Sequence, residues 1–167
     1  MLKCTKSFIS LICIIGAAEA YAQKVTFNFT AQQNISNPAG TIEITETQYG
    51  LLFKPDLHDL TPGVHGFHVH QIADCGNNAV AAGEHFDPKK TKKHLGPYND
   101  SGHLGDLPAL YAAADGTVTL PVLAPRLKKI SEINKRPLII HSEDDNYSET
   151  PKPLGGSNER MACGIVK

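Results

Sequence analysis

The stretch Thr41-Ile42-Glu43-Ile44-Thr45 decides the fold, because its apolar residues alternate strictly with polar ones. Alternation with period 2 predicts a β-strand that has one face on a core and the other in water. Val25, Phe27 and Phe29 repeat the pattern upstream. Further strands are predicted over residues 49–54, 64–71, 117–120, 137–141 and 161–166. Turn residues separate these short runs, so the sequence predicts an all-β sandwich or barrel.

Two long segments lack this periodicity. Residues 72–115 and 144–159 are rich in Gly, Asp, Asn or Ser, and only Tyr111 to Ala114 resembles a single helical turn. Structureless loops of this length in a compact domain are usually functional or disordered. We therefore look for the chemistry of the protein in and around these two loops.

The first 22 residues have the pattern of a secretory signal peptide. Lys3 and Lys6 precede an apolar run over residues 8–18, and Ala20-Tyr21-Ala22 offers an Ala-x-Ala cleavage site. We expect cleavage after Ala22, with Ala20 as the second choice, which leaves one mature domain over residues 23–167. The apolar run is too short for a membrane anchor, which needs about 20 residues.

Charge and cysteine content narrow the class further. The net charge of −1 gives no support to nucleic-acid binding, for which a basic face is expected. Cys4 and Cys13 leave with the signal peptide, so the mature chain keeps Cys75 and Cys163. Two cysteines in an exported protein predict a disulfide, although two free buried thiols would give the same count.

The histidines form the strongest candidate site. His68 and His70 lie two residues apart on a predicted strand, so their rings share one face with Cα atoms about 6.5–7 Å apart. The first long loop adds a second group, and another predicted strand ends on His141. That loop group consists of His85, His94, His103 and Asp106. Imidazole suits zinc, copper, iron and nickel. Six histidines and one aspartate exceed the needs of one tetrahedral ion, whereas two ions that share a ligand fit the count.

Five segments together resemble the signature segments of copper/zinc superoxide dismutases, in particular the bacterial periplasmic type. The resemblance covers the whole mature chain and implies a Greek-key β-sandwich or flattened barrel of about eight antiparallel strands with two long functional loops. The segments are Gly66-Phe67-His68-Val69-His70, His85-Phe86-Asp87-Pro88, Lys93-His94-Leu95-Gly96-Pro97, Gly102-His103-Leu104-Gly105-Asp106-Leu107-Pro108 and Arg160-Met161-Ala162-Cys163-Gly164.

The resemblance also assigns roles to individual residues. Copper is expected on His68, His70, His85 and His141, and zinc on His85, His94, His103 and Asp106. His85 would thus bridge both ions and carry a proton in catalysis. Asp145 is expected to link His68 to His94, Arg160 to attract the anionic substrate, and Cys75 to pair with Cys163. His58 and His65 match no ligand position, and we interpret them as ordinary surface or strand histidines.

The function implied is dismutation of superoxide to oxygen and hydrogen peroxide in the periplasm, with superoxide as the only expected partner. Family members of this type include monomers and dimers, so a homodimer is one of two open states. Two other functions use the same fold: a copper store, and a structural zinc-bearing interaction domain. Both are disfavoured because no expected copper ligand is missing. The basic run of Lys89, Lys90, Lys92 and Lys93 either guides superoxide or belongs to a solvated loop.

Overall fold

The computed structural model describes residues 21–30 and 37–167. Within them the chain forms nine strands and three short 3₁₀ helices. The strands are β1 (Ala22–Phe29), β2 (Pro38–Thr47), β3 (Gly50–Leu57), β4 (Gly63–His65), β5 (Phe67–Val69), β6 (Leu110–Ala112), β7 (Val122–Ala124), β8 (Pro137–His141) and β9 (Arg160–Ile165). The helices are η1 (Val80–Ala82), η2 (Ile130–Ile133) and η3 (Leu154–Gly156). None of these helices is long and apolar enough to cross a membrane.

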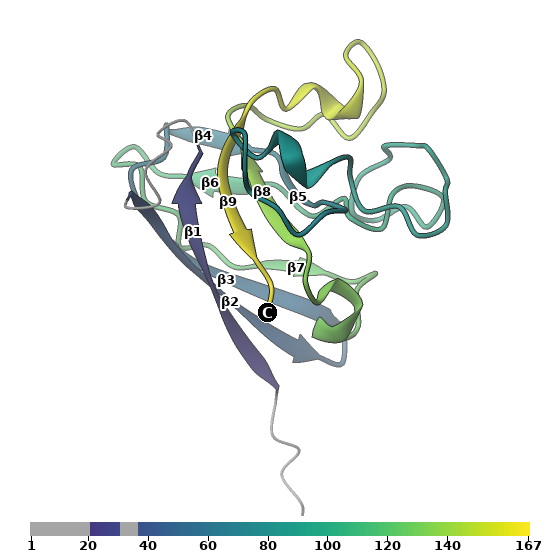
Figure 1. The fold of residues 1–167 in the computed structure, drawn as a ribbon, viewed down its shortest axis with the longest axis horizontal. Coiled ribbons are helices and arrows are strands. Elements are labelled where there is room, and N and C mark those ends of the chain that lie inside the picture. Colours follow the sequence, from purple (N-terminus) through teal and green to yellow (C-terminus); the bar gives the residue numbers. More distant parts are fainter. Residues whose placement is uncertain (1–20, 31–36) are drawn as a thin grey trace, which may run out of the picture.

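Seven strands form one antiparallel sheet in the order β5-β8-β9-β1-β2-β3-β7, and β4 pairs with β6 in a second, small sheet. The large sheet curls over on itself, so that β2 and β3 lie behind β1 and β9 (Figure 1). The rings of Phe53 on β3 and Phe67 on β5 meet edge to face at 5.5 Å, although their strands stand far apart in the sheet order. This contact lies in the core between the two parts of the curled sheet. The antiparallel strand order and the second small sheet agree with the predicted all-β sandwich or flattened barrel.

The alternating sequence accounts for the core. Ile42 and Ile44 on β2 are fully buried, while Thr41, Glu43 and Thr45 remain partly exposed. At the rate of about 1.5–3 kcal/mol for each large apolar side chain, this burial is the main favourable term of folding. The remaining fully buried large side chains include Phe27, Phe53, Phe67, Leu51, Leu107, Leu110, Leu127, Ile133, Leu138 and Ile139.

The strand predicted over residues 64–71 is divided in the structure. β4 pairs with β6, whereas β5 pairs with β8, so the chain changes sheets at Gly66. A Cβ atom at Gly66 would overlap the side chain of Ser157, which explains why this corner needs glycine. His70 lies just beyond β5 and forms an isolated bridge with His85.

Two further local predictions were wrong. Residues 117–120 do not form a strand, because only Val118 pairs, with Leu57, and Pro121 has no N–H with which to extend the ladder. The pairing with β3 is made instead by β7. Tyr111, which resembled part of a helical turn, lies on β6 because Val64 of β4 pairs with it. Tertiary pairing thus overrode local propensity at both places.

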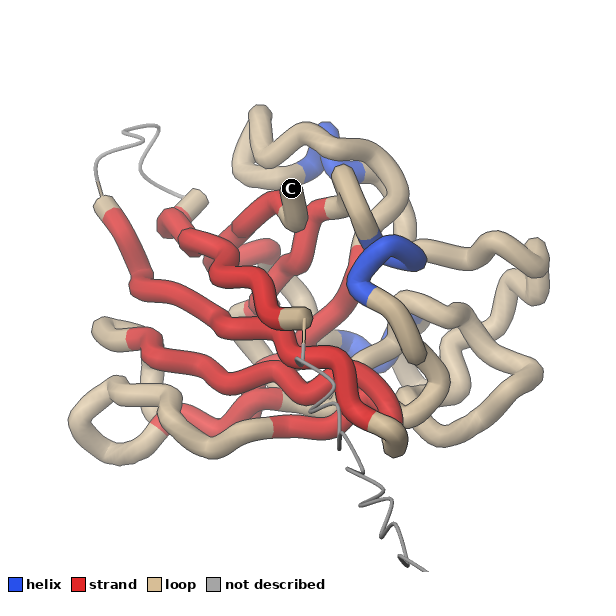
Figure 2. The backbone as a smooth tube through the Cα atoms, turned by 90° about the horizontal axis from the view of Figure 1, so that it is seen from below, coloured by secondary structure: helices blue, strands red, loops and turns tan. Residues whose placement is uncertain are grey.

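The two long loops gather on one side of the barrel. Figure 2 shows the strands on one side of the molecule and most of the loop tube on the other. The first loop returns to the barrel at β6 and the second joins β8 to β9. The predicted signal peptide lies outside the described residues except for Tyr21 and Ala22, and Ala22 begins β1.

Cys75 and Cys163 are bonded, as predicted, and close a sequence separation of 88 residues. The bond attaches the first long loop to the middle of β9. Ala79 and Ala82, both fully buried, pack with Cys163 and Ile139 beside this link.

Reduction of the Cys75–Cys163 bond should lower the free energy of unfolding, because it frees an 88-residue loop in the unfolded chain. The chain-entropy model gives roughly 4 kcal/mol, or about 10 °C in the unfolding midpoint for a domain of this size. Calorimetry with and without reductant measures the change. A double variant with Cys75→Ser and Cys163→Ser should unfold like the reduced protein, and an unchanged midpoint in both would contradict this account.

Candidate metal centre

The site begins on β5, where His68 and Val69 alternate in direction. Val69 is fully buried in the core, and His68 is fully buried on the opposite side. His70 follows, and its ring centroid lies 6.3 Å from that of His68. The predicted sharing of one face by the two histidines is therefore present, although His70 stands outside the strand.

The first long loop lies directly along β5. Phe86 N donates to Val69 O at 2.8 Å, and Val69 N donates to Gly105 O at 2.9 Å. A Cβ atom at Gly105 would overlap Val69 O, so glycine permits this close approach. These backbone bonds place His85 and Asp106, the neighbours of Phe86 and Gly105, beside His68 and His70.

Four buried histidines form what we call the first set: His68, His70, His85 and His141. Their potential ligand atoms all lie within 4.8 Å of one another. His141 joins the set because β8 runs antiparallel to β5 and ends beside it. The His68 and His85 rings stack with their centroids 4.0 Å apart.

The second set consists of His85, His94, His103 and Asp106, again with ligand atoms within 4.8 Å of one another. The Nδ1 atoms of its three histidines lie 3.1, 3.1 and 3.5 Å from Asp106 Oδ1. A tetrahedral ion with metal–nitrogen distances of about 2.0–2.1 Å separates its ligands by roughly 3.3 Å. The second set therefore already has the dimensions of a tetrahedral zinc site.

Asp145 connects the two sets through the ring nitrogens of His68 and His94 that face away from the candidate metal positions. His68 Nε2 donates to Asp145 Oδ2 at 2.7 Å, and His94 Nε2 donates to Oδ1 at 2.8 Å. The carboxylate is almost completely buried. It fixes the orientation of both rings, which is the usual task of a carboxylate beside metal-binding imidazoles.

The unpartnered nitrogens are those that a metal needs. In the part of the chain that the structure describes, seven buried side-chain nitrogen or oxygen atoms lack a hydrogen bond, and five of them are ring nitrogens of the two sets. His70 is typical, since Nδ1 donates to Gly83 O at 2.9 Å while Nε2 has no partner. The five atoms are His68 Nδ1, His70 Nε2, His94 Nδ1, His103 Nδ1 and His141 Nε2. The residues present thus fit bound metal ions.

His65 provides a contrast. It is buried, but both ring nitrogens contact backbone carbonyls: Nδ1 lies 2.8 Å from His141 O, and Nε2 lies 2.7 Å from Thr61 O. His58 is exposed and pairs with its neighbour Asp59. Neither histidine offers a lone pair to the two sets, as the sequence predicted.

Burial favours neutral imidazoles in the first set. It holds the pKa values of His68 and His70 well below the usual range, and the nearby His85 lowers them further. Burial also lowers the pKa of His141 to about 3, with a smaller contribution from His85. Because a metal binds the unprotonated ring, the first set is ready for an ion at neutral pH.

The second set differs in charge. Burial alone would lower the pKa of His94, but the carboxylates of Asp106 and Asp145 outweigh it and raise the pKa to about 9. Burial opposes ionisation of Asp106, yet the surrounding histidines hold its pKa far below the usual range. The anionic carboxylate of Asp106 attracts a cation, which must displace the proton that His94 carries at neutral pH.

Arg160 borders the first set at the start of β9. Its guanidinium donates to Ala79 O at 2.6 Å and to Gly83 O at 2.7 Å, both in the loop that Cys75 attaches to β9. A pocket of about 280 Å³ is lined by Arg160, by three histidines of the first set and by Lys152. The three histidines are His70, His85 and His141.

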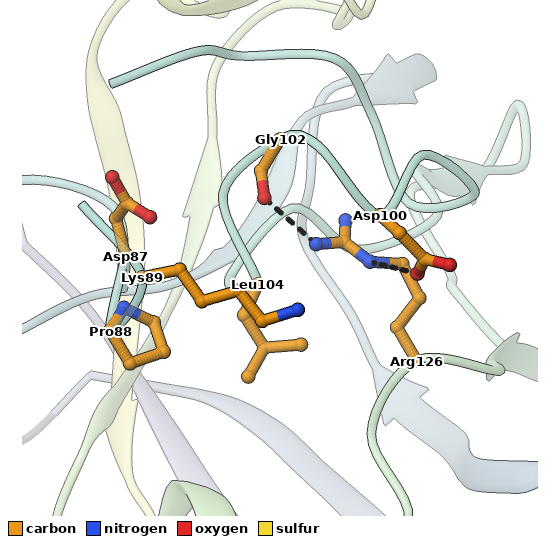
Figure 3. Close-up of a pocket in the computed structure, with 7 residues that line it drawn as sticks. All are labelled: Asp87, Pro88, Lys89, Asp100, Gly102, Leu104 and Arg126. Carbon is orange, nitrogen blue, oxygen red and sulfur yellow. Dashed lines mark hydrogen bonds and ion pairs between the residues drawn. The ribbon is translucent and has the colours of Figure 1, made fainter. Parts of the chain in front are cut away.

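The structure brings every predicted ligand together, along with Asp145 and Arg160. Lys152 was missed, because its position at the pocket depends on the path of the second long loop, for which the local sequence gave no signal. None of the lysines at positions 89, 90, 92 and 93 lines this pocket. Lys89 lines another hollow, with Asp87, Asp100 and Arg126 (Figure 3).

The two histidine sets adjoin each other beside an antiparallel barrel and share His85. This arrangement is that of a protein with two neighbouring metal sites. The family model described as copper/zinc superoxide dismutase (SODC) matches residues 38–166. The chain belongs to this family, and it is accordingly an enzyme that dismutates superoxide with copper and zinc as its cofactors.

Known relatives agree with this assignment. The superoxide dismutase [Cu-Zn] of Escherichia coli (strain K12) is 45% identical over 169 residues, which cover 96% of each chain. That of Haemophilus ducreyi is 50% identical over 81% of this chain and 72% of its own. Among solved structures, Cu/Zn superoxide dismutase from Brucella abortus matches with a TM-score of 0.84 and 45% identity, over 88% of this chain and 100% of its own. The monomeric enzyme from Salmonella enterica matches with a TM-score of 0.76 and 47% identity, over the same shares.

His141→Ala should weaken metal binding in the first set, expected to hold copper, while leaving the second set intact. Loss of a residue that hydrogen-bonds to a metal ligand already lowers metal affinity about 10–100-fold, so loss of the ligand itself should lower it more. His103→Ala is the matched variant of the second set, and His85→Ala should affect both sets. Elemental analysis after dialysis against one equivalent of each metal measures occupancy. Full copper occupancy in the His141 variant would refute the ligand assignment.

Proposed function

We propose that the first set holds the redox-active copper and the second set holds the structural zinc, with His85 as a ligand of both. The observation that carries this assignment is that the two sets differ in how they border the pocket beside Arg160. The pocket is lined by His70, His85 and His141, but by none of the residues that belong to the second set alone. Reactive metal sites keep an open position for substrate, whereas structural zinc sites are closed.

Copper held by the first set would supply the redox chemistry, namely acceptance of an electron from one superoxide and its return to a second, so that oxygen and, with two protons, hydrogen peroxide are formed. The reaction needs such a mediator because two superoxide anions repel each other. His85 Nδ1 faces Asp106, at 3.1 Å from Oδ1, so Nε2 is the atom that faces the first set. We infer that His85 Nε2 carries one of the two protons that peroxide requires.

The substrate is expected to enter beside Arg160. The guanidinium is half-buried and is held by loop carbonyls, so its charge occupies a fixed position at the pocket. Lys152 lies exposed at the same opening, with its stem against Gly156. Two cations at the opening of a concave site attract an anion and raise its rate of encounter, an effect that salt screens.

We further infer that the chain is exported and protects the cell envelope from superoxide. The pattern of residues 1–22 predicts a signal peptide, and the Cys75–Cys163 disulfide is typical of an oxidising compartment such as the periplasm. Fractionation of cells that produce the full chain tests this proposal. Recovery of the uncleaved protein in the cytosol would contradict it.

Purified protein should contain one copper and one zinc per chain and should accelerate superoxide decay. A copper-selective chelator should abolish the activity while zinc remains, because three ligands of the first set line the pocket and His94, His103 and Asp106 do not. Elemental analysis and a superoxide-decay assay on the same samples test both expectations. Activity that survives copper removal, or copper-loaded protein without turnover, would overturn the proposed function and would favour a copper store in the second case.

Arg160→Ala should reduce the rate by about tenfold or more at low salt and equal copper content, with a smaller effect at high salt. Lys152→Met should reduce it less, with the same dependence on salt. Lys89→Met makes the same change in charge at a different hollow, so it is the matched control and should behave like the wild type. If Lys89→Met lowers the rate as much as Lys152→Met, guidance belongs to the basic run instead.

A further inference from the structure

Arg126 stands out among the residues that the mechanism does not use. It follows β7 and extends its side chain into the loop that carries the second set (Figure 3). Only 10% of the side chain is exposed. A nearly buried guanidinium is expected to have a definite set of partners, since an unpaired buried charge is costly.

The partners of Arg126 are three backbone carbonyls of one loop segment. Nη1 donates to Gly96 O at 3.2 Å and to His103 O at 3.0 Å, and Nη2 donates to Gly102 O at 2.9 Å. Nε also lies 3.6 Å from Asp100 Oδ1. The side chain of Asp100 is 92% exposed, so this ion pair contributes little. The carbonyl contacts are therefore the main interaction of Arg126.

His103 is held through its backbone, because its N–H donates to Lys93 O at 2.9 Å and its carbonyl accepts from Arg126 and, at 3.3 Å, from Asp106 N. Asp106 is held by a bridge to His68 and His85 by a bridge to His70. His94 is fixed by Asp145 and by Glu149, whose Oε1 accepts from His94 N at 2.6 Å. Among residues 21–30 and 37–167 no hydrogen bond to His103 Nε2 is found, whereas Nε2 of His94 is held by Asp145.

We propose that Arg126 is a positioning residue of the second set, which fixes His103 by holding its carbonyl and that of Gly102 near the end of β7. The inference rests on the proposed assignment of zinc to this set. Arginine suits the task because its planar fork presents five donors and no acceptor, and can bond several carbonyls at once. A lysine at this position could reach one or two of them, but without the fixed geometry.

The proposal is tested with Arg126→Met, Arg126→Lys and the matched control Asp100→Asn, which removes the ion pair and keeps the carbonyl contacts. Zinc affinity is measured by competition with a chromophoric chelator, and cobalt(II) reports the geometry of the set through its visible spectrum. Arg126→Met should weaken zinc binding about 10–100-fold and alter the cobalt spectrum. Arg126→Lys should recover part of the loss, Asp100→Asn should stay within about twofold, and copper affinity should not change.

Wild-type zinc affinity and an unaltered cobalt spectrum in Arg126→Met would overturn the proposal. So would a loss that Asp100→Asn reproduces, because the ion pair would then be responsible. If Arg126→Met does not fold, Arg126→Lys decides: a weaker zinc affinity with an unchanged midpoint of the metal-free form supports positioning, and an equal affinity refutes it. A wild-type protein that binds neither zinc nor cobalt in this set would instead refute the proposed function.

Discussion

The site depends on one buried carboxylate, that of Asp145, between the rings of His68 and His94. His68 belongs to the barrel and His94 to the first long loop, while Asp145 itself begins the second. A single side chain thus joins three segments that are distant in the sequence. A Cβ atom at Gly155 would overlap the carboxylate, so the second loop can fold over it only with glycine there. Each set keeps its geometry because these two rings cannot rotate independently.

The same arrangement makes metal binding part of the folding energetics. The five unpartnered ring nitrogens are buried, and each such group costs about 1–3 kcal/mol when it has neither water nor a partner. An ion held in each set would satisfy these atoms and would stabilise only the folded chain, which alone brings them together. The loops, which have little regular structure, therefore gain order from the ions as well as from Asp145.

Much of this could be predicted from the sequence because the decisive signals are local. Period-2 alternation located β1, β2 and β3, and a continuous apolar run located β8. The candidate ligands were recognisable by type and spacing, while their division between two ions was implied by the family resemblance. The errors arose where pairing between distant segments decided the structure. Gly66 transfers the chain from one sheet to another, and Tyr111 becomes part of a strand only because Val64 lies beside it. Lys152 and Arg126 were missed for the same reason, since their roles depend on which loop lies across from them.

The first long loop, which borders the first set, is also attached to β9 at two points that are close together in the sequence. Cys163 fixes the first loop covalently through its disulfide with Cys75. Arg160, three residues earlier, donates hydrogen bonds to Ala79 O and Gly83 O of the same loop. Gly83 O in turn accepts from His70 Nδ1. One carbonyl therefore contacts both the guanidinium that we propose to attract the substrate and His70 of the first set. Displacement of this loop would move both Arg160 and His70. The disulfide that holds the loop therefore contributes both to the stability of the barrel and to the geometry of the site.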